Sequence, residues 1–162
     1  MSSQSEGLTP CVARHLVRQT VTLERTIVKK VITVGVFDYF HLGHLCLFEN
    51  AKALGDYLIV AVQDGDCILK TKPQAQVLYT TEQRMHMISS LRPVDEVIIY
   101  QDVDTILPTV DFDVFAKGPD QNHAGFQAAV KWCEEHGKEV VVLPRTPGIS
   151  SSDIKHQISE LA

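Results

Sequence analysis

Short apolar runs alternate with segments of helical periodicity along most of this chain, and this alternation restricts the fold more than any other feature. Five runs have the composition of strands: 31–37, 57–62, 94–100, 113–116 and 139–143. Helices are expected between and after them, at 41–54, 80–91, 104–110, 124–136 and 151–161. Alternating strands and helices predict a parallel sheet with right-handed crossovers. We therefore expect an α/β fold, a Rossmann-like single domain with a five-stranded parallel sheet flanked by helices.

The chain of 162 residues is long enough to bury a sizeable core in one domain. We place this domain at 29–162, after a polar arm at 1–28. Within the arm, residues 2–5 are expected to be disordered. The segment 20–24 alternates polar and apolar residues, which suggests a short strand or an arm that contacts a partner.

Charge and composition exclude several classes of protein. A net charge of −5 argues against a general nucleic-acid binder, which would carry a basic face. No apolar stretch approaches the roughly 20 residues that cross a bilayer, and no basic-then-apolar leader is present, so we expect a cytoplasmic protein without a membrane partner. The widely spaced cysteines predict free thiols in a reducing compartment; they are Cys11, Cys46, Cys67 and Cys133.

Local signals define the ends of several elements. Gly55 is expected to cap the first helix and Gly137 to end the helix at 124–136. Thr80 and Gln83 have the spacing of a capping box. The segment 64–79 is predicted to be a polar connection, broken by Pro73.

The segment 35–44, Gly-Val-Phe-Asp-Tyr-Phe-His-Leu-Gly-His, joins the first predicted strand to the first predicted helix. Ligands of open α/β sheets collect at such places, where unpaired helix amides favour phosphate. Gly43 allows a ligand close to the backbone, and His41 and His44 share one face of the first turn. A zinc site that adds Cys46 or Asp38 is the alternative interpretation.

A second motif, Arg-Thr-Pro-Gly-Ile-Ser-Ser-Ser at 145–152, lies about a hundred residues further on. Its serines suit the start of the last helix, and arginine suits phosphate through its planar fork of donors. Together the two motifs resemble the signatures of the cytidylyltransferase-like nucleotidyltransferases over roughly 29–160. Length and spacing are most similar to the small bacterial glycerol-3-phosphate cytidylyltransferases.

The resemblance implies an enzyme that joins CTP to a small phosphorylated alcohol, with glycerol 3-phosphate favoured, and releases pyrophosphate. It also implies Mg²⁺ on the triphosphate and a homodimer. Two alternatives remain open at this point. One is an adenylyltransferase of the same fold that acts on a sugar phosphate or a cofactor precursor, and the other is a nucleotide-binding module without activity.

By resemblance, the predicted catalytic residues are His41, His44, Lys70, Arg92 and Arg145. The predicted nucleotide-binding residues are Gly35, Phe37, Asp38, Gly43, Lys72, Gly118, Asp120, Thr146, Ile149, Ser150 and Ser151. Asn122 and His123 are predicted acceptor contacts, although capping of the next helix is the slightly preferred interpretation of both.

Plainer interpretations accompany several of these residues. Lys70 and Lys72 are solvated loop lysines by default, and Arg84 and Arg92 would each make a surface salt bridge. We expect a functional role for Arg92 and a structural one for Arg84. Asp38 has two options, to orient His41 or to approach the metal.

The segment 117–120, Lys-Gly-Pro-Asp, departs from the Gly-Asp-Asp-Trp of the glycerol-3-phosphate enzymes. Its lysine is similar to that in the Lys-Gly-Gly-Asp-Tyr of related adenylyltransferases. This strand end faces the base and ribose in the family, so cytosine and adenine both stay open.

Overall fold

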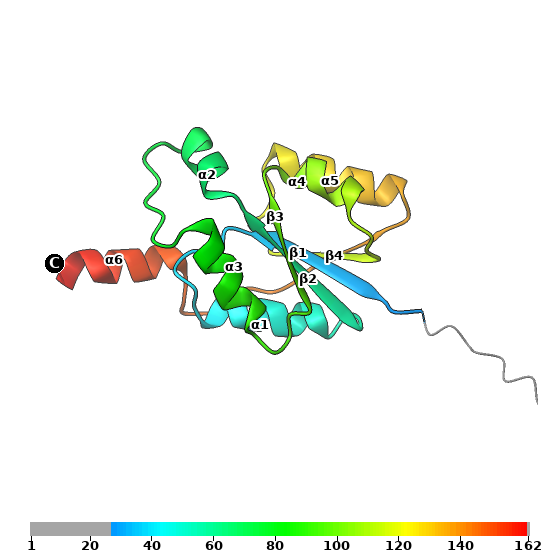
Figure 1. Ribbon diagram of the computed structural model, residues 1–162, viewed down its shortest axis with the longest axis horizontal. Helices are drawn as coiled ribbons and strands as arrows, with labels where there is room; N and C mark the ends of the chain where they lie inside the picture. The colour runs from blue at the N-terminus through cyan, green and yellow to red at the C-terminus, as the bar shows by residue number, and fades with distance from the viewer. Residues whose placement is uncertain (1–26, 162) are drawn as a thin grey trace, which may run out of the picture.

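The computed structural model describes residues 27–161. The arm predicted at 1–28, its possible strand at 20–24 and Cys11 therefore lie almost wholly outside the described residues. Within 27–161, five strands form one parallel sheet in the order β3-β2-β1-β4-β5 (Figure 1). The strands are β1 Lys30–Gly35, β2 Tyr57–Gln63, β3 Glu96–Tyr100, β4 Val114–Lys117 and β5 Glu139–Val142. The predicted Rossmann-like α/β domain is thus confirmed.

Helices connect the strands as predicted, with one addition. They are α1 Leu42–Lys52, α2 Gly65–Thr71, α3 Thr81–Ser89, α4 Val103–Ile106 with the 3-10 turn η1 Leu107–Thr109, α5 Ala124–Glu135 and α6 Ser151–Leu161. The predicted short helix around Pro108 therefore divides into an α-helical and a 3-10 turn. The part of the chain that the structure describes contains no helix long and apolar enough to span a membrane.

Two hydrophobic clusters cover the two faces of the sheet. In one cluster, strand residues such as Ile32 and Ile59 pack against α4, η1 and α5. In the other, Val31 and Leu58 pack against α1 and α3, and Phe48 of α1 is fully buried. Successive strand residues point to opposite faces, which is why both clusters draw on the same strands. A sheet covered on both faces explains the continuous apolar runs in the sequence.

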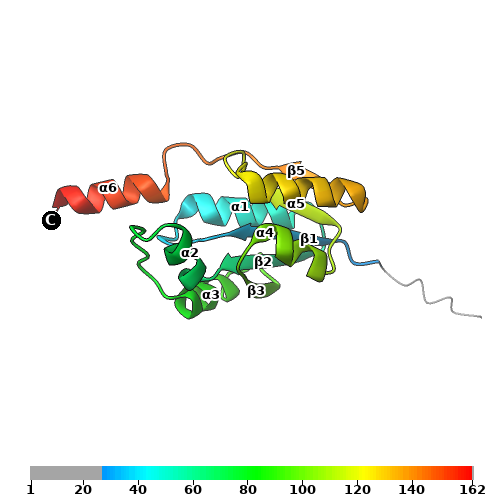
Figure 2. The ribbon, with the colours of Figure 1, turned by 90° about the horizontal axis from the view of Figure 1, so that it is seen from above.

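The last helix, α6, differs from the others because it projects from the body of the domain (Figures 1 and 2). None of its described residues is buried, and Ile158 and Leu161 are exposed. Its N-terminal part contacts the rest of the chain through Ser151 and Lys155.

The segment predicted as a polar connection contains a helix instead, so this prediction is wrong over 65–71. Asp64 caps α2 by accepting a hydrogen bond from the amide of Asp66 at 3.2 Å, and Ile68 is buried. A single buried side chain in seven residues leaves no apolar periodicity to detect. The helix ends before Pro73, as proline requires.

Two glycines show different reasons for the same residue type. Gly137 has φ +65° just after α5, which confirms its predicted role as a helix stop. Gly55 does not cap α1, because the C-cap is Ala53 and Gly55 lacks a positive φ. A Cβ at Gly55 would lie 2.5 Å from the carbonyl oxygen of Lys29, so glycine is needed there for close backbone packing.

Arg84 is structural, as predicted, but it makes no surface salt bridge with any residue of 27–161. Its side chain is fully buried in α3, which begins with the predicted capping box of Thr80 and Gln83. The guanidinium donates to the carbonyl oxygens of Val36 at 2.6 Å and Gln63 at 2.8 Å. Arg84 thereby joins the chain after β1 to the end of β2 directly beneath the site.

Candidate active site

A pocket of about 440 Å³ lies at the carboxyl ends of β1 and β4. From β1 the chain builds the sheet outward on one side through β2 and β3, and then on the other side through β4 and β5. The end of β1 is therefore the point where the strand order reverses. Open α/β sheets bind ligands at such a point. Both motifs found in the sequence line this pocket, together with α2 and the loop that follows it.

Fourteen of the residues predicted for the site line this pocket, although their roles stay predictions. They are Gly35, Phe37, Asp38, His41, Gly43, His44, Lys72, Gly118, Asp120, Arg145, Thr146, Ile149, Ser150 and Ser151. The acidic chain thus gathers cationic and imidazole groups at one place, as anionic substrates would need.

His41 occupies the N-cap position of α1 rather than its first turn. Its Nδ1 accepts a hydrogen bond of 3.0 Å from the amide of Gly43. Neutral imidazole has one N–H, so this contact assigns the proton to Nε2, which is left free to donate. A Cβ at Gly43 would lie 2.9 Å from the His41 ring, so glycine lets the ring fold back over the turn.

His44 lies behind His41, with the two rings stacked at 3.9 Å between centroids. Phe37 meets the ring of His44 edge-on at 5.4 Å, and Phe40 lies at 5.5 Å. Burial, helped by neighbouring His41 and opposed by Asp38, lowers the pKa of His44 to about 4. Burial and the charge of Arg145 lower the pKa of His41 as well. Both imidazoles are therefore neutral near pH 7 until an anion approaches.

The Nδ1 atom of His44 is buried without a hydrogen-bond partner among the described residues. An unsatisfied buried polar atom costs about 1–3 kcal/mol, and such cost is common at functional sites. The backbone before it is strained too, because Phe37 has φ 53° and Tyr39 has φ 50°. This loop, 36–41, is therefore held in a conformation that its own residues do not prefer.

The Asp38 carboxylate binds the backbone of another loop and makes no hydrogen bond to His41 among the described residues, whereas its predicted approach to the metal stays a prediction. It is buried and accepts hydrogen bonds from the amides of Leu78 at 2.7 Å and Tyr79 at 3.0 Å. The Asp38 carbonyl oxygen accepts a further bond of 3.2 Å from Ser151 Oγ. Asp38 thus ties the loop after α2 and the start of α6 to the first motif.

The second motif supplies the opposite wall of the pocket. Ser150 caps α6, because its Oγ accepts from the amide of Asp153 at 3.1 Å and donates to the Asp153 carboxylate at 2.6 Å. Arg145 lies 3.7 Å from Asp120, and both side chains are largely exposed. Such an exposed pair is weak, so Arg145 can exchange its partner for a phosphate at little cost.

Lys155 also lines the pocket, and the sequence analysis missed it. Its ammonium group donates to the carbonyl oxygen of Gln76 at 3.2 Å and lies 4.8 Å from the centre of the Tyr39 ring. No carboxylate pairs with it among the described residues. Lys155 follows Ser151 by four residues, and this one-turn spacing on a predicted helix was the available signal.

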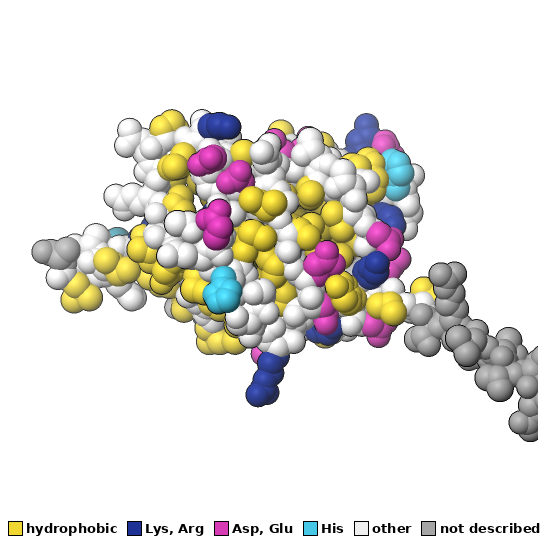
Figure 3. All heavy atoms as spheres, in the orientation of Figure 1, with side chains coloured by type: hydrophobic (Ala, Val, Ile, Leu, Met, Phe, Trp, Pro, Cys, Tyr) yellow, Lys and Arg dark blue, Asp and Glu magenta, His cyan; other side chains and the backbone are white. Residues whose placement is uncertain are grey.

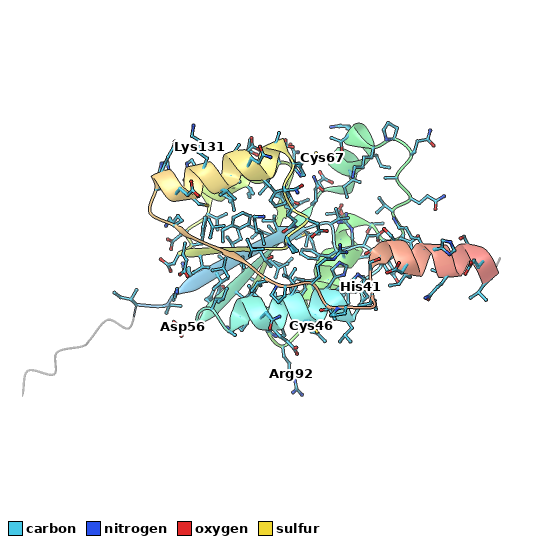
Figure 4. The ribbon with its side chains drawn as sticks, turned by 180° about the vertical axis from the view of Figure 1, so that it is seen from behind. His41, Cys46, Asp56, Cys67, Arg92 and Lys131 are labelled. Atoms are coloured by element: carbon cyan, nitrogen blue, oxygen red, sulfur yellow. The ribbon has the colours of Figure 1, made fainter. Side chains whose placement is uncertain are left out.

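Four predicted residues do not line this pocket: Lys70, Arg92, Asn122 and His123. Lys70 is exposed in the last turn of α2, whereas Lys72 lines the pocket. Arg92 is exposed at the turn before β3, at the opposite end of the strands, and Figure 4 shows it projecting away from His41. A single chain therefore does not bring Arg92 to the site.

His123 stands at the N-cap position of α5, in line with the preferred interpretation from the sequence, although its side chain makes no capping bond. It lines a second cavity instead. Asn122 lines neither cavity and uses its carbonyl oxygen to accept from Gln127.

The segment after β4, which differs from that of the glycerol-3-phosphate enzymes, is held in place by its own side chains. Lys117 donates to the carbonyl oxygen of Gln121 at 2.9 Å. The Gln121 amide accepts from the backbone N–H of Gly118 and donates to the carbonyl oxygen of Val34, each at 2.8 Å. Lys117 and Gln121 therefore shape this wall, and Gln121 was another residue that the sequence analysis missed.

No three His, Cys, Asp or Glu side chains gather as a metal site within 27–161. The zinc alternative named Cys46 or Asp38 as a further ligand, and the two oxygens of Asp38 already accept backbone amides. What the pocket offers is N–H, hydroxyl and cationic groups around a space with helix starts on two sides. This donor set suits a polyphosphate, whose charge it can hold and neutralise.

Comparisons with known proteins agree with this chemistry. The family model described as cytidylyltransferase-like matches residues 32–157. A glycerol-3-phosphate cytidylyltransferase from Bacillus subtilis strain 168 is 40% identical over 82% of this chain and 99% of its own length. The protein of that name from Staphylococcus aureus is 35% identical over 80% of this chain and 95% of its own. An FAD synthase from Ferroglobus placidus is 41% identical over 58% and 61%.

A solved structure supports the fold independently. The lipopolysaccharide core biosynthesis protein from Thermoplasma volcanium superposes with a TM-score of 0.60 at 26% identity, over 74% of this chain and 98% of that one. The matched family model includes both motifs and every strand of the sheet except the first two residues of β1. The chain therefore belongs to the cytidylyltransferase-like family, and it is an enzyme of the nucleotidyltransferase class.

Proposed function

We propose that this enzyme transfers the cytidylyl group of CTP to a small phosphorylated alcohol, with glycerol 3-phosphate as the favoured acceptor. The observation that supports this most is the convergence of two helix starts, those of α1 and α6, on one pocket lined by His41, His44, Lys72 and Arg145. The high similarity to glycerol-3-phosphate cytidylyltransferases over nearly their whole length favours the substrate pair.

In the proposed reaction, an oxygen of the acceptor phosphate attacks the α-phosphorus of CTP. A new P–O bond forms while the bond from the α-phosphorus to its bridging oxygen breaks, and pyrophosphate leaves with that electron pair. The acceptor phosphate is already ionised, so no base is needed. Alignment of the two phosphates and neutralisation of developing charge supply the catalysis.

Each motif has a distinct part in this proposal. His41, with its proton on Nε2, donates a hydrogen bond to the α-phosphate. His44 lies beside it, and its buried Nδ1 has no hydrogen-bond partner among the described residues. An anion beside the two rings raises the pKa of both, so they gain charge as the phosphates bind. Arg145 and the amides at the start of α6 hold the β- and γ-phosphates.

We further propose that Mg²⁺ accompanies the triphosphate. Mg²⁺ binds mainly to phosphates and water, with one or two protein carboxylates. Asp120 fits this limited part, because it lines the pocket and its contact with Arg145 is long and exposed. When bound, the ion neutralises part of the triphosphate charge. Addition of EDTA is expected to abolish pyrophosphate release, and excess Mg²⁺ to restore it.

A pyrophosphate-release assay with each of the four nucleoside triphosphates and glycerol 3-phosphate tests the proposal. We expect turnover with CTP, and loss of turnover in His41→Ala without loss of fold by circular dichroism. His86→Ala, on an exposed part of α3, is the matched control and should keep full activity. Equal turnover of ATP and CTP would contradict the choice of base.

Adenylyl transfer is the second candidate, and two observations favour it. The FAD synthase match shows that this chain is also similar to a relative with a different product. The segment after β4, with Lys117 and the glutamine-held turn, departs from the glycerol-3-phosphate enzymes at the wall expected to face the base. Turnover with ATP but not CTP would select this alternative.

We also propose a homodimer that works in the cytoplasm. β3 forms one edge of the sheet, Ile99 on it is exposed, and Figure 3 shows hydrophobic side chains gathered on the face over this strand. Exposed apolar groups at a sheet edge are often covered by a partner. Cys46, Cys67 and Cys133 are free thiols, which suits a reducing compartment. Light scattering in solution would measure the oligomeric state.

A further inference from the structure

Strand β5 forms an edge of the sheet, with no neighbouring strand on its outer side among residues 27–161. The amide of Glu139 donates to the carbonyl oxygen of Asp113 at 3.0 Å, so the odd-numbered amides of β5 point toward β4. The backbone groups of successive strand residues point to opposite sides. The amide and carbonyl groups of Val140 and Val142 therefore point outward from this edge.

This edge lacks the features that usually prevent a strand from pairing with another one. Its sequence at 139–142 is Glu-Val-Val-Val, without lysine or proline, and its pairing with β4 is regular, without a bulge. The side chain of Val142 is 55% exposed. Proteins protect an apolar edge of this kind by covering it.

A segment of the same chain lies within reach of the β5 edge. Residues 20–24, Thr-Val-Thr-Leu-Glu, precede the described part and alternate polar and apolar residues, as a half-buried strand does. The five residue steps from residue 24 to Lys29 span up to about 17 Å when extended. A strand beside β5 would lie three strand spacings from β1, or about 14 Å. The connection is therefore long enough.

The same length determines the direction of the segment. A strand parallel to β5 would end near the carboxyl ends of the strands, and its connection would have to return along the whole sheet to the start of β1. Five residue steps cannot cover that path together with the three strand spacings. The segment 20–24 can therefore lie beside β5 only in the antiparallel direction.

Charged groups favour the β5 edge over the β3 edge. The ammonium group of Lys29, the residue just before β1, pairs with the Glu139 carboxylate at 3.1 Å, so the chain that enters β1 already contacts the start of β5. Arg25 follows the segment 20–24 and would come to the same end of β5. The Glu139 side chain is 55% exposed and has room for this second cation.

We propose that residues 20–24 form a sixth strand, antiparallel to β5, that covers this edge of the sheet. Its backbone pairs with Val140 and Val142, and Val21 and Leu23 share one face of the extended sheet. The domain then begins within the arm and not at residue 29. Of the two sheet edges formed by the described residues, only β3 remains open to another molecule, which limits association through sheet edges to two copies.

Hydrogen exchange of the full chain, measured by NMR, tests this inference. We expect the amides of Val140 and Val142 to exchange at least about tenfold more slowly in wild type than in Thr22→Pro/Leu23→Pro. Proline has no N–H to donate to β5, and two consecutive prolines are used because alternate residues of a strand face its neighbour. Gly7→Pro/Leu8→Pro is the matched control outside 20–24 and should exchange like wild type.

The amide of Val141 points toward β4 and reports whether the domain stays folded, because its exchange should be slow in all three proteins. Equal exchange of Val140 and Val142 in wild type and Thr22→Pro/Leu23→Pro would overturn the inference. Protection that rises with protein concentration would assign the β5 edge to a second copy of the chain. Protection of the outward amide of Ile98 that Thr22→Pro/Leu23→Pro removes would place the segment on β3. Either of these results would also overturn the inference.

Discussion

The two helix starts that face the first pocket are held in different ways. At α1, the ring of His44 lies among Phe37, Phe40 and the other histidine, above the fully buried Phe48. At α6, no side chain is buried, and the first turn is held by single hydrogen bonds such as Ser151 Oγ to Asp38 at 3.2 Å. The hydrophobic core fixes the first start, whereas polar contacts hold the second.

This difference assigns different duties to the two motifs. A group fixed by the core is already placed before substrate arrives, which favours the chemical step. A segment held by exchangeable polar contacts can tighten when phosphate replaces them, which favours binding. Substitutions at α1 should therefore act mainly on kcat, and substitutions at α6 mainly on KM for the nucleotide.

The largest effect is expected at the histidines. His41→Ala or His44→Ala should lower kcat by about 100- to 1000-fold, because each removes a donor that stabilises charge in the transition state. Steady-state kinetics with CTP measures this loss. Near-normal kcat in either variant, with an intact fold, would show that the start of α1 does not act in the chemical step. It would also contradict the division of roles between α1 and α6.

Arg145→Ala comes next, with an expected fall in kcat/KM for CTP of about 100-fold. Its guanidinium is expected to hold two phosphate oxygens at once, so Arg145→Lys should recover only part of the loss. If KM is unchanged in Arg145→Ala while kcat falls, Arg145 acts in the chemical step and not mainly in nucleotide binding.

Acid should weaken the α1 region through His44. Its pKa is about 4 in the folded protein, against about 6.5 for an unfolded histidine. Between these pH values the unfolded chain binds a proton that the native chain does not. The contribution of His44 to the free energy of unfolding is therefore fully present above pH 6.5 and is lost as the pH drops toward 4. The loss is about 3 kcal/mol at most. Urea unfolding of wild type and His44→Asn across this range measures it; parallel curves would contradict the assignment.

The smallest effect is expected at Lys155. Lys155→Met should raise the KM for CTP about tenfold with little change in kcat, because its ammonium group exchanges Gln76 for phosphate. The matched control is Lys131→Met, at an exposed position of α5. Binding of CMP, which lacks the β- and γ-phosphates, should be the same in both variants. A weaker affinity for CMP in Lys155→Met would show a general change of the pocket.

The fold was predictable because a sheet covered on both faces leaves continuous apolar runs, and the strands end close to the predicted limits. Helix α2 was not, because one buried isoleucine makes no period. A structural role for Arg84 could be predicted, but its partners could not. They are backbone carbonyl oxygens, which every residue type carries, so the sequence does not indicate them. Asp38 illustrates the same limit, since its amide partners lie forty residues away.

The candidate site divides along similar lines. Motif residues reached the pocket because local turns fix them, whereas Lys70 and Lys72 depended on an unforeseen helix that turned the first away. The second cavity was hidden, since Tyr100 and Asp102 belong to different elements from His123 and meet only through the sheet order. Spacing alone cannot show such a meeting.

The left-handed backbone at Tyr39 creates a trade-off between thermal stability and affinity for the substrate. A non-glycine residue at φ 50° costs roughly 1–3 kcal/mol, which glycine would largely avoid. The same replacement would remove the aromatic ring beneath the ammonium group of Lys155. Selection for survival at high temperature alone would therefore favour glycine at this position, and the more robust enzyme would hold its nucleotide less tightly.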